Sequence, residues 1–150
     1  MRALHSLSRR CAAAAFVGLV LLAGAAHAAT SELVVIVSAR NPLTALHVDQ
    51  VAAIFLGQAL RFPDGVEAEP LDQRIGSPLR DAFYARVANK TPALLKAHWS
   101  KMVFTGRGQP PAELADSAAV RRRVAADADA IGYIERGALD ASVRAVLVVP

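Results

Sequence analysis

The sequence predicts an α/β domain: a single lobe with a mainly parallel central sheet flanked by helices. Two continuous apolar runs rich in β-branched residues, Leu33 to Val37 and Val143 to Val149, are typical of strands buried on both faces. Between these runs, apolar residues recur at helical spacing in several separate segments. Strands at both ends of the chain with helices between them indicate this layered fold, whose ligand sites lie at the carboxyl ends of strands.

The first half of the domain is expected to contain one helix and two strands. Asp49 to Leu56 has helical periodicity, and Gly57 suits the position after its C-terminus. Val66 to Leu71 alternates apolar and acidic residues, as an outer strand does. The loops Ser38 to Asn41 and Asp72 to Ser77 both leave carboxyl ends of strands, so we expect them to face one site.

The second half is expected to contain three helices and two strands. Leu79, Phe83 and Val87 define one buried face of a helix that begins at Ser77. A second helix is expected from Pro92 to about Phe104, with Trp99 in the core. A third helix is capped by Asp116, and its residues Arg121 to Arg123 are expected to be solvated. The last two strands are expected at Ala130 to Ile134 and Val143 to Val149.

The first 28 residues have the pattern of a secretory signal peptide that is removed on export. A basic start is followed by the apolar run Cys11 to Ala25 and by the small-x-small cleavage signal Ala26-His27-Ala28. The alternative is a membrane anchor, but the run is shorter than the roughly 20 apolar residues that a spanning helix needs. We therefore expect a periplasmic protein with one domain at residues 29–150, because that length suits a single core.

Removal of this segment changes the charge and the available chemistry. Three arginines leave with it, so basic residues fall from 17 to 14 against 13 acidic residues, and the net charge falls from +4 to +1. A general basic field for nucleic acid is therefore absent. Cys11 is the only cysteine, so the exported chain has no disulfide and no thiolate ligand.

The strongest candidate for a functional site is the loop that leads into the helix at Ser77. Serine is a preferred N-cap residue, and Pro78 suits the first helical turn. Free backbone N–H groups at such a helix start attract anions, and Arg74 and Arg80 lie nearby in sequence. The alternative is that Ser77 and Pro78 only begin a helix and that the arginines are solvated.

Several short landmarks occur in an order that resembles the phosphate-binding component of bacterial ABC transporters. The landmarks are Ile54-Phe55-Leu56-Gly57, Ser77 with Phe83, Trp99, Phe104-Thr105-Gly106 and Ala130-Ile131-Gly132-Tyr133-Ile134. The resemblance covers nearly the whole exported chain, from Leu33 to Val149, and it is to a short, single-lobe variety of the periplasmic binding proteins. It implies a non-enzymatic protein that binds an oxyanion, without a cofactor, beside a membrane transporter.

The resemblance implies an anion cradle of a Ser-Gly-Thr turn and an upstream arginine, and this chain departs from that pattern. Ser77 matches the serine, but Pro78 stands at the glycine position, Leu79 at the threonine position and Gln73 at the arginine position. Proline has no N–H and leucine has no hydroxyl, so only Ser77 is carried over.

We expect Arg80 and Arg74 to supply the charge that the cradle lacks, because a guanidinium can pair with an oxyanion through two hydrogen bonds. Ser38 and Arg40 are expected to approach the same anion from the neighbouring loop. Together with Ser77, these four residues form the predicted ligand site.

Other chemistry finds little support in the sequence. The two histidines of the exported chain, His47 and His98, are 51 positions apart and do not form a metal-ligand spacing. Gly76-Ser77-Pro78 lacks the second glycine of a nucleophile elbow, and no histidine base is near. We therefore expect neither an enzyme nor a metal protein.

Two functions remain open at the level of sequence. The first is an exported solute-binding domain that holds phosphate or a similar oxyanion at the start of the Ser77 helix. The second is an interaction or sensory module that keeps the lobe, has lost tight ligand binding, and acts on a periplasmic or membrane partner. The missing glycine, threonine and arginine donors motivate the second hypothesis.

Overall fold

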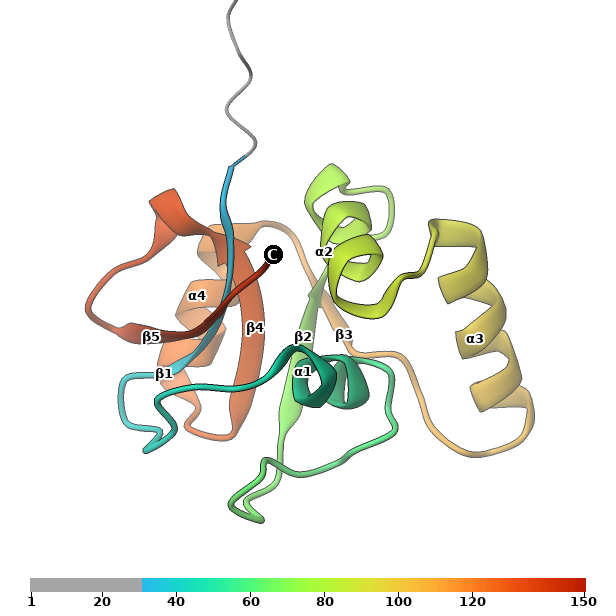
Figure 1. Ribbon diagram of the computed structural model, residues 1–150, viewed down its shortest axis with the longest axis horizontal. Coiled ribbons are helices and arrows are strands. Elements are labelled where there is room, and N and C mark those ends of the chain that lie inside the picture. The colour runs from blue at the N-terminus through green and yellow to red at the C-terminus, as the bar shows by residue number, and fades with distance from the viewer. Residues whose placement is uncertain (1–30) are drawn as a thin grey trace, which may run out of the picture.

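The computed structural model describes residues 31–150 as a mixed α/β lobe (Figure 1). The predicted signal peptide, residues 1–28, lies outside these described residues. In chain order the elements are β1 (Leu33–Ser38), α1 (Val48–Phe55), β2 (Glu69–Gln73), α2 (Pro78–Ala88), α3 (Pro92–Phe104), β3 (Ala112–Leu114), α4 (Ser117–Ala126), β4 (Ala130–Glu135), the 3-10 turn η1 (Arg136–Ala138) and β5 (Val143–Val148).

One sheet joins the strands in the order β3-β2-β4-β1-β5. β2 is parallel to β3 and to β4, which forms the parallel centre of the sheet. The predicted fold class, an α/β lobe with a mainly parallel central sheet and flanking helices, is therefore confirmed. β1 is the strand that departs from this pattern, because it is antiparallel to both β4 and β5.

The direction of β1 decides which loops can share a site. Val37, near the end of β1, lies opposite Ile131, near the start of β4. Glu69, at the start of β2, pairs with Ala130. The end of β1 therefore lies at the edge of the sheet where β2 and β4 begin, and the end of β2 lies at the opposite edge.

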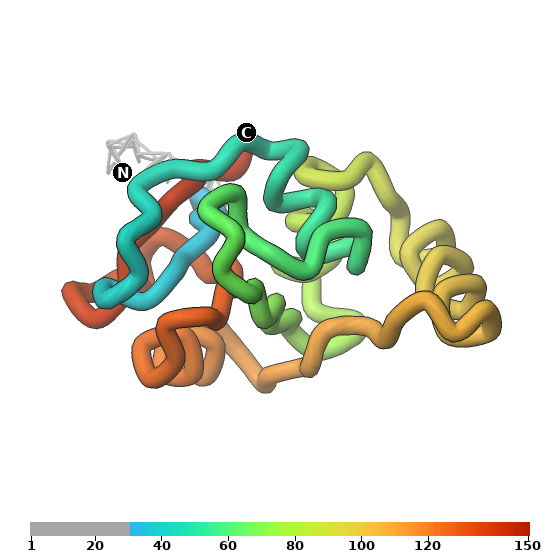
Figure 2. The backbone as a smooth tube through the Cα atoms, turned by 90° about the horizontal axis from the view of Figure 1, so that it is seen from below, coloured from blue at the N-terminus to red at the C-terminus, as the bar shows by residue number. Residues whose placement is uncertain are grey.

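Side chains alternate between two cores, one on each face of the sheet. On one face, Val35 and Tyr133 pack with residues of α1 and α2, and the Phe83 ring stacks on Tyr133 with 3.8 Å between ring centroids. On the other face, Val34 and Ile134 pack with α4. Figure 2 shows α1 and α4 on opposite sides of the sheet. Both faces are covered, which explains why β1 is a continuous apolar run.

α3 lies at one end of the molecule, away from β5, in both views (Figure 1, Figure 2). Its attachment depends on Leu95 and Trp99, which are buried. The tip of the Trp99 ring packs on Gly57, where an added Cβ would lie 3.1 Å from the ring. Gly57 also has a φ of 68°, which favours glycine. The prediction that Trp99 belongs to the core is confirmed.

Strands β2 and β3 differ from the sequence prediction. β2 runs from Glu69 to Gln73 rather than from Val66 to Leu71, so Asp72 and Gln73 belong to a strand and not to the loop in which we expected them. The short strand β3, the outermost strand next to β2, was not predicted, because the three residues after the Pro110-Pro111 pair carry no periodic signal. The later end of β2 carries Asp72 into the interior, where it is 1% exposed.

Gly132 tests the contact between α4 and the sheet. A Cβ at this position would lie 2.4 Å from Cγ1 of Val120, so Gly132→Ala forces α4 away from β4. We expect a loss of about 1–3 kcal/mol in the free energy of unfolding, measured by urea denaturation. Gly137→Ala is the matched control, because nothing lies within 4 Å of its added Cβ. Equal stability of the two variants would contradict this packing.

Candidate functional site

A cavity of about 740 Å³ lies at the carboxyl end of β2, between the start of α2 and the start of α4. β2 contributes Gln73, which is followed by Arg74 and the turn into Ser77. Ser117 lines the cavity from the first turn of α4. Two helix N-termini therefore meet one cavity, and both carry partial positive charge.

Ser77 is the N-cap of α2, as the sequence predicts, with Pro78 in the first turn. Its backbone is extended, with φ −70° and ψ 127°, and its side chain makes no capping hydrogen bond. The preceding Gly76 has a φ of 86°, the left-handed conformation that the turn from β2 requires. The Ser77 hydroxyl is thus not used to hold α2 and remains a donor for the cavity.

The start of α4 is organised differently. Asp116 is its N-cap, and the Asp116 carboxylate accepts a hydrogen bond from the Ala119 N–H at 2.8 Å. The Ser117 hydroxyl accepts a hydrogen bond from Nε2 of Gln73 at 3.2 Å. This bond ties the end of β2 to the start of α4 beside the cavity, which both residues line.

The charges of the cavity are mixed. Arg74 and Arg86 line it, and so do Asp116 and Glu135. We did not predict Ser117, Arg86 or Asp116 as site residues. The Asp116-Ser117 pair was recognised as a helix start, but only the sheet order brings that start beside α2, and Arg86 carries no sequence signal of its own.

Arg80, which we predicted beside the anion, has a different position. Its Nε donates to Oδ2 of Asp72 at 2.9 Å, and its side chain is only 8% exposed. It does not line the cavity at Ser77. The physical reason is that β2 extends to Gln73 and buries the Asp72 carboxylate, which then requires a cation. The prediction that Arg80 faces the Ser77 cavity is therefore wrong.

Asp72 is the centre of a buried hydrogen-bond cluster. Its carboxylate accepts from the Tyr133 hydroxyl, from the Tyr84 hydroxyl at 3.0 Å, from the Gln73 N–H at 2.8 Å and from Arg80. Burial raises the pKa of Asp72, and the bonds from Tyr133 and Arg80 oppose that rise. Burial and the neighbouring Asp72 charge raise the pKa of both tyrosines, so both remain protonated donors.

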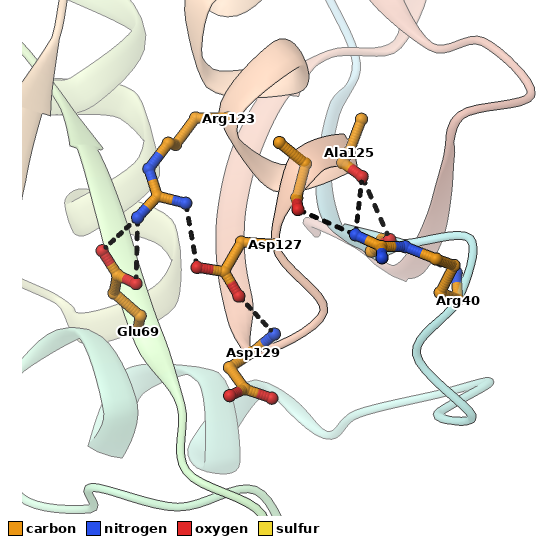
Figure 3. Close-up of polar contacts among 8 residues, drawn as sticks. Arg40, Glu69, Arg123, Ala125, Asp127 and Asp129 are labelled. Atoms are coloured by element: carbon orange, nitrogen blue, oxygen red, sulfur yellow. Dashed lines mark hydrogen bonds and ion pairs between the residues drawn. The ribbon is translucent and has the colours of Figure 1, made fainter.

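Ser38 and Arg40 lie at the opposite edge of the sheet from Ser77, because β1 is antiparallel to β4. The Arg40 guanidinium donates to the carbonyls of Ala126 at 2.8 Å and Ala125 at 3.4 Å (Figure 3). It thereby binds the C-terminus of α4, the negative end of that helix. The expectation that Ser38 and Arg40 approach the same anion as Ser77 is wrong, and only Ser77 and Arg74 of the predicted set share the cavity.

The basic triplet of α4 was expected to be solvated, and two of its members make ion pairs. Arg123 bridges Glu69 at 3.0 Å and Asp127 at 2.9 Å (Figure 3). Arg121 pairs with Asp140 at 3.1 Å. These half-exposed pairs stabilise the surface only weakly.

Within residues 31–150, no three His, Cys, Asp or Glu side chains gather in an arrangement that could hold a metal ion. In the same residues, no helix has the length and apolar character needed to cross a membrane.

Comparison with known proteins gives matches in structure alone. No protein-family model matches the sequence, and no curated protein matches it. Among solved structures, one similar chain is a protein from Clostridium perfringens that is described as a phosphate ABC transporter substrate-binding protein with bound phosphate (25% identity, TM-score 0.61). Two others are an ABC-type phosphate transport receptor from Vibrio cholerae (18% identity, TM-score 0.61) and PstS from Borrelia burgdorferi (14% identity, TM-score 0.58).

These similarities cover 77%, 77% and 75% of this chain, respectively, but only 44%, 45% and 45% of the other chains. The chain thus spans less than half the length of the proteins it matches. The match confirms the resemblance to phosphate substrate-binding proteins at the level of fold. Substrate-binding proteins are not enzymes, which agrees with the expectation that this chain is not one.

The buried pair of Asp72 and Arg80 gives a direct test of the cluster. Asp72→Asn leaves the Arg80 charge buried without its counter-ion, so we expect a loss of roughly 3 kcal/mol in the free energy of unfolding. Adding Arg80→Met removes that charge and is expected to restore much of the loss. Thermal and urea denaturation measure both variants. A double variant less stable than the single one would contradict the account.

Proposed function

We propose that the chain is an exported solute-binding domain that binds inorganic phosphate or a similar tetrahedral oxyanion in the cavity at Ser77. The observation that carries the proposal is the start of α2, where an N-cap serine with an uncommitted hydroxyl lies beside Arg74 in a cavity between two helix N-termini. The fold is shared with a protein whose structure contains bound phosphate, which supports the same ligand class.

In this proposal each group has a defined role. The Ser77 hydroxyl and the first N–H groups of α2 donate hydrogen bonds to the anion, while Pro78 contributes none. Arg74 and Arg86 supply positive charge, and an arginine can bind two oxygens of one oxyanion. Ser117 lies at the second helix start, where a further hydroxyl is available.

The acidic residues of the cavity bear on selectivity. Asp116 and Glu135 can accept a hydrogen bond but, when ionised, cannot donate one. Hydrogen phosphate carries a proton that it can donate to such a carboxylate, whereas sulfate at neutral pH does not. We therefore expect phosphate to bind more tightly than sulfate in this cavity.

The proposed location is the periplasm, after removal of residues 1–28, and the proposed partner is a membrane transporter that receives the anion. Such a domain would capture the ligand outside the membrane and present it to that transporter. Because water reaches an open charged site, affinity should fall as ionic strength rises, with a Debye length of about 8 Å in physiological salt.

Calorimetric titration with phosphate tests the proposal. Ser77→Ala and Arg74→Ala should each weaken phosphate binding by about tenfold, because each removes a hydrogen bond to a charged ligand. Arg40→Ala is the matched control for charge: it lies at the opposite edge of the sheet and should leave the affinity unchanged. Absence of heat at millimolar phosphate, with the protein folded, would overturn the proposal.

A second candidate function is an interaction or sensory module that acts on a periplasmic or membrane partner. The observation that favours it is the Asp116 carboxylate, which already accepts the Ala119 N–H and so offsets the positive end of α4 that an anion would use. Cross-linking in intact cells would recover the same partner from the Ser77→Ala/Arg74→Ala variant as from the unmodified protein. Tight phosphate binding without any cross-linked partner would exclude this candidate.

A further inference from the structure

The Ser77 cavity extends well beyond the start of α2. Its volume is about 740 Å³, and Leu79, Ala82 and Arg86 of α2 all line it. These positions follow the spacing i, i+3 and i+7, so they lie on one face of the helix and span roughly 10 Å along it. Cavities of this size hold small organic molecules. A phosphate group at Ser77 therefore occupies one end of a longer cavity.

Gln73 brings a buried acceptor without a partner to this cavity. The residue is 3% exposed and belongs to the lining. Its Nε2 donates to the backbone carbonyl of Tyr133 at 3.3 Å and to the Ser117 hydroxyl at 3.2 Å. A carbonyl oxygen only accepts, so the amide nitrogen must be on that side and Oε1 is the free atom. Within residues 31–150 no donor bonds to Oε1, and it is not among the fully buried atoms that lack a partner. Oε1 is thus available to a hydrogen-bond donor in the cavity.

Two carboxylates lie close to Gln73. The Ser117 hydroxyl that accepts from Gln73 also accepts from the Glu135 N–H at 3.4 Å, and Asp116 directly precedes Ser117. Three acceptor-bearing residues of the lining therefore surround one hydroxyl. Hydrogen phosphate carries a single proton, so it can donate to only one of these acceptors. The other acceptors remain without a donor when inorganic phosphate is the ligand.

The cations of the cavity belong to the start and the face of α2. The backbone carbonyl of Arg74 accepts from the Ser77 N–H at 3.1 Å, and Arg86 lies further along the helix. None of Arg74, Arg86, Asp116 and Glu135 makes an ion pair within residues 31–150. The lining thus carries two positive and two negative side chains that do not neutralise one another. A ligand that carries both charges is complementary to this lining, whereas a simple anion is not.

We propose that the ligand of the Ser77 cavity is a phosphomonoester that carries an ammonium group on a short chain. This inference rests on the proposed oxyanion site. The phosphate group accepts hydrogen bonds from Ser77 and Arg74. The ammonium group has three donors, which serve Oε1 of Gln73 and the carboxylates of Asp116 and Glu135. The three acceptors and the acidic charges thereby gain a partner that inorganic phosphate does not supply.

Calorimetric titration with O-phosphoethanolamine and with propyl phosphate tests this inference. The two probes have the same length, but only the first carries an ammonium group. O-phosphoethanolamine should bind at least about tenfold more tightly, because its ammonium makes charge-assisted hydrogen bonds. Glycerophosphoethanolamine, the diester found as a lipid headgroup, should bind more weakly than the monoester, because esterification removes a negative charge. Tighter binding of the diester would overturn the assignment of a monoester.

The double variant Asp116→Asn/Glu135→Gln removes both carboxylate charges with little change in shape. Asparagine is also a preferred N-cap residue, so α4 keeps its start. In this variant the preference for O-phosphoethanolamine should disappear, while the affinity for propyl phosphate should stay the same or rise. Glu67→Gln is the matched control: Glu67 is exposed and precedes β2, at the opposite edge of the sheet, so the preference should remain.

The outcomes separate this inference from the proposed function. Equal affinities for O-phosphoethanolamine and propyl phosphate, or a preference that survives the double variant, would overturn the inference and leave the proposed oxyanion function standing. Failure of inorganic phosphate and of both monoesters to bind to the folded protein would overturn both.

Discussion

The buried carboxylate of Asp72 is the interaction on which the arrangement of this lobe depends. It lies at the end of β2 and accepts hydrogen bonds from Arg80 and Tyr84 of α2 and from Tyr133 of β4. Burying a charge is unfavourable unless it is paired and hydrogen-bonded, so these elements must meet at one point. The position of α2 relative to the central strands is thereby determined.

This cluster also gives the two sides of the α2 start different chemistry. On one side, Ser77 and Arg74 line a cavity shared with the start of α4, where we propose that an oxyanion binds. On the other side, Arg80 and Trp99 are among the residues that line a second, mostly apolar cavity beside α3. The buried pair of Asp72 and Arg80 thus lies outside the lining of the Ser77 cavity, and an anion at Ser77 need not disturb it.

The sequence predicts the elements well because apolar runs and helical spacing report burial directly. It predicts Ser77 correctly as an N-cap because the Ser-Pro pair has a local cause. It fails for Arg40, because an apolar run does not reveal whether a strand such as β1 is parallel or antiparallel to its neighbour. It fails for Arg80 because Arg80 pairs with the buried Asp72, and Asp72 is buried only because β2 continues to Gln73. It fails for Ser117 because the contact between α4 and β2 joins residues far apart in the sequence.

The central claim, that phosphate binds at the start of α2, is tested most directly by amide chemical shifts in an NMR titration with phosphate. We predict saturable shifts at the backbone amides of Ser77, Leu79 and Ser117, with none at Arg40 on the opposite edge of the sheet. Shifts confined to Arg40 and the end of α4, or the absence of any saturable shift at Ser77, would contradict the account.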